Sequence, residues 1–166
     1  AEEPIEKKIT RILIHRKMTV TAAESCTGGL ASSLVTDVPG SSEYLLGSAV
    51  TYSNMAKHKL INVSEESLEA YGAVSWQVAC EMAQGVRELF GTTYGVGITG
   101  IAGPGGATED KPVGLVYMAV ADADGVKWAK HIFGGTRTDN KMRSALTAIS
   151  MVIDRIKEKE TENKDK

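Results

Sequence analysis

The sequence has no excess of basic residues and only two cysteines, and each shortage excludes a class of protein. Lys and Arg together number 19 against 21 Asp and Glu, whereas proteins that bind nucleic acid without sequence preference usually carry a basic stripe. Cys26 and Cys80 are too few for a disulfide framework, and no Cys or His residues have the paired spacing of zinc ligands. We therefore expect no nucleic-acid partner and no metal site.

Long apolar runs are also missing. No segment approaches the roughly 18–20 apolar residues that span a bilayer. The first 19 residues do not follow the order of a signal peptide, which is a basic region, an apolar region and a small-residue cleavage site. These absences predict a cytoplasmic protein with no membrane partner.

Glycine, in contrast, is abundant. The chain of 166 residues, a length typical of one domain, contains 17 glycines, which exceeds the usual share of about 7%. Glycine allows sharp bends and close approach of the backbone to a partner. Ten of these glycines lie in three segments, after Ser25, between Gly95 and Gly106, and before Arg137. We predict that the three segments form the wall of one binding site.

The apolar periodicity alternates between helix and strand. We predict helices over 4–17, from about 30, over 54–61 with Asn54 as N-cap, from 64, over 75–90 and over 136–157. The predicted strands cover 18–23, 47–53 and 94–99, and 112–121 and 126–133 form a hairpin. This order is typical of an α/β fold, a single-domain α/β/α sandwich with a mixed, mostly parallel sheet and a β-hairpin in the C-terminal half. The domain would cover 1–157, and 158–166 would be a charged flexible tail.

Two phosphate-binding motifs are excluded. Gly95 to Gly100 match the spacing GxGxxG, but the first two glycines lie inside a predicted strand and no helix follows, as a dinucleotide-binding motif requires. The spacing GxxxxGK[ST] of a P-loop does not occur.

Ser25 stands between a predicted strand and a glycine pair that starts a helix. The free N–H groups of such a turn can hold a phosphate or the oxyanion of an acyl-transfer reaction. Alternatively, Ser25 or Thr27 only caps the helix. Cys26 is either a rival nucleophile or a small buried residue.

Three further features have a functional and an ordinary interpretation. Lys57, one turn into a predicted helix, is either a surface group or a buried amine that activates a serine. The segment from Gly100 to Gly106 is either a mobile loop or a set of uncovered N–H groups facing a ligand. Arg137 either clamps a phosphate or lies exposed.

Five segments in order resemble one family: Glu24–Gly29, Tyr52-Ser53-Asn54-x-x-Lys57, Gly72–Ser75, Ile98–Gly106 and Lys111–Gly114. Together they are similar to the CinA C-terminal domain family, which includes nicotinamide mononucleotide deamidases, over about residues 5–157. The resemblance implies hydrolysis of the carboxamide of nicotinamide mononucleotide to nicotinate mononucleotide and ammonia, without metal or other cofactor, in a homodimer. Many members also have an N-terminal domain that acts on ADP-ribose, an activity we do not expect from this sequence.

The resemblance also assigns roles to residues. It implies that Ser25 is the nucleophile and Lys57 the general base, and that Ser42, Tyr52 and Thr99 line the site. We expect the Ser25 proton to reach Lys57 directly or through Tyr52 or Ser42. The substrate-binding residues would be Thr27, Gly28, Gly29, Thr99, Gly100, Gly103, Gly105, Arg137 and Lys141. Members often carry an aliphatic residue and a second arginine where this sequence has Asn140 and Lys141. That departure motivates an alternative, a non-catalytic nucleotide-phosphate binding or regulatory module of the same fold.

Overall fold

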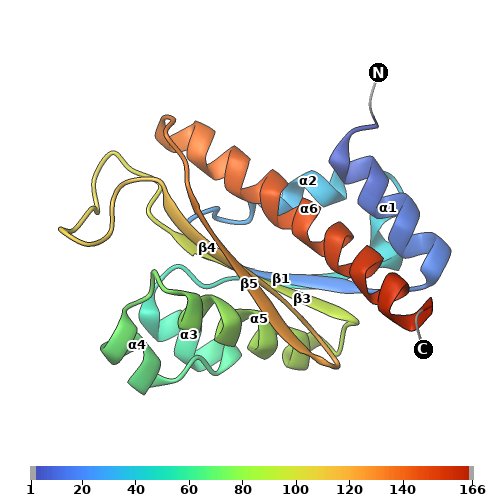
Figure 1. Cartoon of the computed structure of the whole chain (residues 1–166), viewed down its shortest axis with the longest axis horizontal. Coiled ribbons are helices and arrows are strands. Elements are labelled where there is room, and N and C mark those ends of the chain that lie inside the picture. Colours follow the sequence, from blue (N-terminus) through green and yellow to red (C-terminus); the bar gives the residue numbers. More distant parts are fainter. Residues whose placement is uncertain (1–2, 165–166) are drawn as a thin grey trace.

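The computed structural model describes residues 3–164, which form a five-stranded sheet between two layers of helices (Figure 1). The strand order is β2-β1-β3-β4-β5. The neighbours β2, β1 and β3 are parallel, whereas β4 is antiparallel to β3 and to β5. The strand bounds are Val20–Glu24 for β1, Leu45–Val50 for β2, Tyr94–Gly100 for β3, Leu115–Asp122 for β4 and Gly125–Ile132 for β5. The predicted mixed sheet and its late hairpin are confirmed.

Helices lie on both sides of the sheet (Figure 1). On one face lie α1 (Ile5–Arg16), α2 (Leu30–Thr36) and α6 (Arg137–Lys164), and on the other α3 (Asn54–Ile61), α4 (Glu65–Tyr71) and α5 (Trp76–Phe90). A short 3-10 helix, η1 (Ser41–Glu43), precedes β2. The larger core cluster packs α1, α2 and α6 on the sheet, with Leu13, Ile98 and Ile153 among its buried members. The predicted α/β/α sandwich is confirmed.

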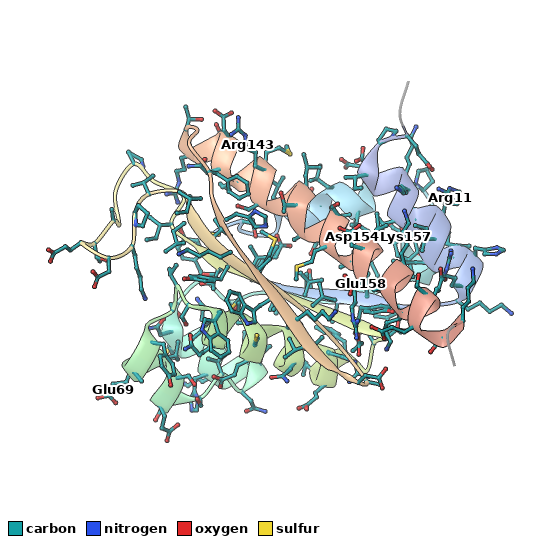
Figure 2. The ribbon with its side chains drawn as sticks, viewed as in Figure 1. Arg11, Glu69, Arg143, Asp154, Lys157 and Glu158 are labelled. Atoms are coloured by element: carbon teal, nitrogen blue, oxygen red, sulfur yellow. The ribbon has the colours of Figure 1, made fainter. Side chains whose placement is uncertain are left out.

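The last helix is longer than its apolar pattern indicates. We predicted its end at Lys157, followed by a flexible tail, but α6 continues through Lys164, and 165–166 lie outside the described residues. Ion pairs hold the added turns, because Glu160 pairs with Arg16 and the Lys159 Nζ lies 2.8 Å from Asp124 Oδ2. Asp154, Lys157 and Glu158 lie along its exposed side (Figure 2). Within residues 3–164 no helix is long and apolar enough to cross a membrane.

The chain enters α3 differently from the prediction. Strand β2 ends at Val50 rather than at Ser53. Ser53 itself is the N-cap of α3, because its hydroxyl accepts the N–H of Ala56 at 3.0 Å, a role that we predicted for Asn54. Thr51 and Tyr52 therefore lie in a loop between β2 and α3, and their backbone carbonyl groups point toward α3.

Much of the glycine excess serves close packing of α5 rather than the site. A Cβ at Gly95 would lie 2.4 Å from the Ala83 carbonyl oxygen, and one at Gly97 equally close to that of Ala79. At Gly85 it would lie 1.8 Å from the Ile61 carbonyl oxygen of α3. The prediction that Gly95 and Gly97 line a binding site is therefore wrong, since they admit α5 against the sheet.

Candidate functional site

Ser25 lies at the carboxyl end of β1, at the centre of the parallel strands. Its backbone N–H donates to the Ile98 carbonyl oxygen of β3 at 3.0 Å, which ties the residue to the neighbouring strand. The chain then turns sharply through Gly28 and Gly29, whose φ angles of 63° and 102° favour glycine. The turn from Ser25 to Gly29, here called the nucleophile turn, thus precedes α2 as the sequence predicts.

Lys57 is a buried amine in direct contact with Ser25. Its side chain is 1% exposed, and its Nζ donates to the Ser25 Oγ at 2.9 Å. The carbonyl oxygens of Thr51 and Tyr52 accept from the same Nζ at 2.7 and 3.2 Å. Burial lowers the pKa of Lys57 to about 8, because the charged ammonium loses its solvation. Lys57 is therefore not the surface group of the ordinary interpretation, and it is suited to accept a proton from Ser25.

Glu24 supports the nucleophile turn, and the sequence analysis missed this role. Its carboxylate is fully buried and accepts hydrogen bonds from the Thr27 hydroxyl at 2.7 Å and the Ala31 N–H at 2.8 Å. The N–H and hydroxyl of Ser32 donate to its second oxygen at 3.0 and 2.7 Å. A charged residue at the end of an otherwise uncharged strand was the signal for such a role.

Two expectations about this turn are corrected by Glu24. The first N–H groups of α2 already bind the Glu24 carboxylate, so a phosphate does not need to occupy them. Neither Ser25 nor Thr27 caps α2 in the described structure, because the Ser25 Oγ accepts from Lys57 and the Thr27 hydroxyl donates to Glu24. Within residues 3–164, the N–H groups of Cys26, Thr27 and Gly29 donate to no other residue.

Cys26 is a poor nucleophile in this environment. Burial raises the pKa of its thiol to about 11, and the nearby Glu24 carboxylate adds to the shift. The reactive form of cysteine is the thiolate, which is scarce at neutral pH when the pKa is this high. The interpretation of Cys26 as a small buried residue is therefore favoured over that of a rival nucleophile.

A cavity of about 250 Å³ opens beside Ser25, and most of the residues predicted for the site lie on its wall. It lies between the nucleophile turn, β3, the segment before α5 and the glycine-rich loop of residues 101–106. The Thr99 hydroxyl is buried there and donates to the Ala73 carbonyl oxygen at 2.9 Å. The predicted residues on its wall are Ser25, Tyr52, Thr99, Gly100, Gly103, Gly105 and Arg137.

Two basic side chains from the start of α6 border the site. The Arg137 guanidinium donates to the Gly103 carbonyl oxygen at 2.8 Å and to the Tyr52 hydroxyl at 3.1 Å. The Lys141 Nζ lies 3.9 Å from the point that a Cβ on Gly28 would occupy. Arg137 and Lys141 therefore bring positive charge to both the glycine-rich loop and the nucleophile turn, as anion binding requires.

Ser42 does not reach this site. It is exposed in η1, just before β2 begins, and Val20 at the start of β1 pairs with Leu45 at the start of β2. Because the two strands are parallel, Ser42 lies near their amino-terminal ends, whereas Ser25 lies at their carboxyl-terminal ends. A five-residue strand separates the two ends by about 15 Å. The predicted role of Ser42 in proton transfer is wrong for a site built within one chain.

The family model for the CinA C-terminal domain matches residues 2–156. The chain belongs to this family. It is 47% identical over 165 residues to a CinA-like protein of Chlorobaculum tepidum and 46% identical over 153 residues to one of Desulforapulum autotrophicum. These matches cover 96% and 92% of the chain but only 39% and 36% of the two relatives. The CinA-type domain therefore spans little more than a third of the length of these curated relatives.

Solved CinA structures have the same fold. The competence/damage inducible protein CihA from Agrobacterium tumefaciens superposes with a TM-score of 0.87 at 38% identity, covering 92% of this chain and 96% of that one. A CinA superfamily protein from Escherichia coli gives 0.86 at 31% identity, with 90% and 87% covered. The architecture that holds Ser25 and Lys57 together is thus that of the CinA superfamily.

Proposed function

We propose that this CinA-type domain is an amidohydrolase that converts nicotinamide mononucleotide to nicotinate mononucleotide and ammonia. The observation that carries the proposal is the 2.9 Å contact between the buried Lys57 Nζ and the Oγ of Ser25, which lies on the wall of the cavity. A lysine with a lowered pKa beside a serine is one of the known ways to activate a hydroxyl nucleophile. The resemblance of the motifs supplies the substrate.

In the first half-reaction, neutral Lys57 takes the hydroxyl proton of Ser25 while the Ser25 Oγ bonds to the carboxamide carbon. The resulting oxyanion is stabilised by free N–H groups of the nucleophile turn. Protonated Lys57 then gives its proton to the leaving nitrogen, the carbon–nitrogen bond breaks and ammonia departs. Because Lys57 touches Ser25 directly, no relay through the Tyr52 hydroxyl is needed, and that hydroxyl accepts from Arg137.

In the second half-reaction, water attacks the acyl ester on Ser25 and Lys57 accepts the proton of that water. The bond from the carbonyl carbon to the Ser25 Oγ breaks, the Oγ regains a proton from Lys57, and nicotinate mononucleotide leaves. Arg137 and Lys141 neutralise the substrate phosphate in this proposal, Arg137 by hydrogen bonds and Lys141 as a point charge. No metal or other cofactor takes part, and a homodimer in a cytoplasmic setting remains a prediction.

Replacing Ser25 tests the nucleophile. We expect Ser25→Ala to reduce ammonia release from nicotinamide mononucleotide by at least about 10³-fold, because the acyl-enzyme cannot form, while the substrate still binds. Cys26→Ala is the matched control at the next position and should keep activity within about threefold of the wild type. Turnover near the wild-type value in Ser25→Ala, or its loss only in Cys26→Ala, contradicts the proposal.

The same assay separates catalysis from simple binding. Lys141 beside Gly28 and Arg137 on the glycine-rich loop would also suit a nucleotide-phosphate binding module. Calorimetric titration of the wild-type protein with nicotinamide mononucleotide distinguishes the two functions when it is run beside the ammonia assay. Tight binding without ammonia release would favour the binding module.

A further inference from the structure

Asn140 is a buried polar residue that none of the catalytic steps uses. It lies in the first turn of α6, and its side chain is 1% exposed. Its Oδ1 accepts the Gly135 N–H at 3.0 Å, and its Nδ2 donates to the carbonyl oxygens of Ala102 at 3.0 Å and Gly135 at 3.1 Å. Burying an amide costs free energy unless it is hydrogen-bonded, and here both N–H groups of the amide are used. The contact with Ala102 joins α6 to the glycine-rich loop.

These bonds fix the orientation of one peptide plane. The Ala102–Gly103 peptide is trans, since the cis peptide of the described chain is Gly103–Pro104. In a planar trans peptide the C=O and N–H groups point in opposite directions. Because Asn140 holds the Ala102 carbonyl oxygen toward α6, the Gly103 N–H points away from Asn140. Within residues 3–164 that N–H has no acceptor, and both Ala102 and Gly103 line the cavity.

We propose that Asn140 is a positioning residue, which orients the Ala102–Gly103 peptide so that the Gly103 N–H donates a hydrogen bond to an oxygen of the substrate. The inference rests on the proposed function for the identity of that substrate. Arg137 donates to the next carbonyl oxygen, that of Gly103, so the first turn of α6 forms hydrogen bonds with two successive peptide groups of the loop. The asparagine that departs from the common family pattern thus has its own contact with the glycine-rich loop.

Two substitutions test the role of Asn140. Asn140→Leu has a similar shape and removes all three hydrogen bonds. Asn140→Asp keeps an acceptor for Gly135 but cannot donate to Ala102, so it tests the contact with the loop more selectively. Asn163→Leu, an exposed position near the other end of the same helix, is the matched control. Hydrogen exchange of amides 101–107 reports the loop, steady-state kinetics with nicotinamide mononucleotide report KM and kcat, and thermal unfolding reports the fold.

We expect faster exchange in the loop and a KM raised about tenfold in both Asn140 variants, with kcat changed less than about threefold, because the bond forms equally in ground and transition states. Asn163→Leu should match the wild type. Wild-type exchange in a folded Asn140 variant, or faster exchange with unchanged KM, overturns the proposal. If Asn140→Leu does not fold, Asn140→Asp decides the outcome alone. If the wild type releases no ammonia, the proposed function fails, while exchange and calorimetric binding of nicotinamide mononucleotide still decide the role of Asn140.

Discussion

At the residue scale, the protonation state of Lys57 controls the proposed reaction. Burial lowers the pKa of Lys57 from 10.5 to about 8, so at neutral pH most of the lysine is still protonated and cannot act as a base. We expect kcat to rise with pH along a limb with an apparent pKa near 8, changing about tenfold per pH unit below about pH 7. A pH profile of ammonia release measures this limb. An activity that is flat from about pH 6 to 9 would contradict Lys57 as the base.

The same shift has a consequence for stability, and its sign follows from linkage. The folded state binds the Lys57 proton more weakly than the unfolded state, in which the pKa is close to 10.5. Between about pH 8 and 10.5 the unfolded chain therefore binds more protons, and this residue makes the fold more stable as pH rises through that window. A loss of activity on the alkaline side would accordingly not reflect Lys57.

Glu24 shows what sequence reasoning could not reach at this scale. Its place beside Ser25 is visible in the sequence, but its four hydrogen bonds come from Thr27, Ala31 and Ser32, which face it only after α2 has formed. A carboxylate without water is stable when several donors surround it. The partners of Glu24 therefore depend on the fold of the turn.

At the scale of elements, α5 packs against its neighbours through glycine. We expect Gly85→Ala to lower the free energy of unfolding by at least about 2 kcal/mol, because the new Cβ would lie 1.8 Å from the Ile61 carbonyl oxygen, which outweighs the gain in helix propensity of about 1 kcal/mol. Urea unfolding measures the change. Gly134→Ala is the control, since a Cβ there has no atom within 4 Å, and it should be neutral or stabilising by up to about 1 kcal/mol. Equal effects of both changes would refute the packing role.

At the scale of the whole molecule, an ion-pair network ties the C-terminal end of β4 to α6. The buried Asp122 carboxylate lies 2.9 Å from the Arg155 Nε and 3.2 Å from the Lys159 Nζ. Burial alone would raise the pKa of Asp122, but hydrogen bonds from the Asp124 N–H, Arg155 and Lys159 together lower it. The network therefore extends α6 beyond the residues that its apolar pattern indicates.

This network has a predictable dependence on pH. The lowered pKa means that Asp122 stabilises the fold fully above its unfolded value of 3.8 and loses this contribution as pH falls through the folded value. We expect Asp122→Asn to cost about 2–4 kcal/mol at neutral pH, since it leaves Arg155 partly unpaired. Urea titrations at about pH 7 and pH 3 measure the difference, which should shrink at the lower pH. A difference that is the same at both values would exclude an ionic origin.

The sequence by itself determined the order of helices and strands, the α/β/α class and the pairing of Ser25 with Lys57 as a hypothesis. The elements follow from apolar periodicity, whereas the pairing of Ser25 with Lys57 was implied by the resemblance of the motifs to the CinA C-terminal domain family. The boundaries of β2 and α6 were predicted incorrectly, because capping by Ser53 and the ion pairs of α6 compete with apolar periodicity.

Only the tertiary structure decided which residues meet. Because β1 and β2 are parallel, Lys57 lies next to Ser25 at the carboxyl-terminal ends of the strands, and Ser42 lies near their amino-terminal ends. The close approach of α5 gives Gly95 and Gly97 a role in packing, and the position of α6 brings Asn140 into contact with the glycine-rich loop. In each case the reason is physical: contacts between segments distant in sequence depend on strand direction and on the space between packed elements, which no single segment encodes.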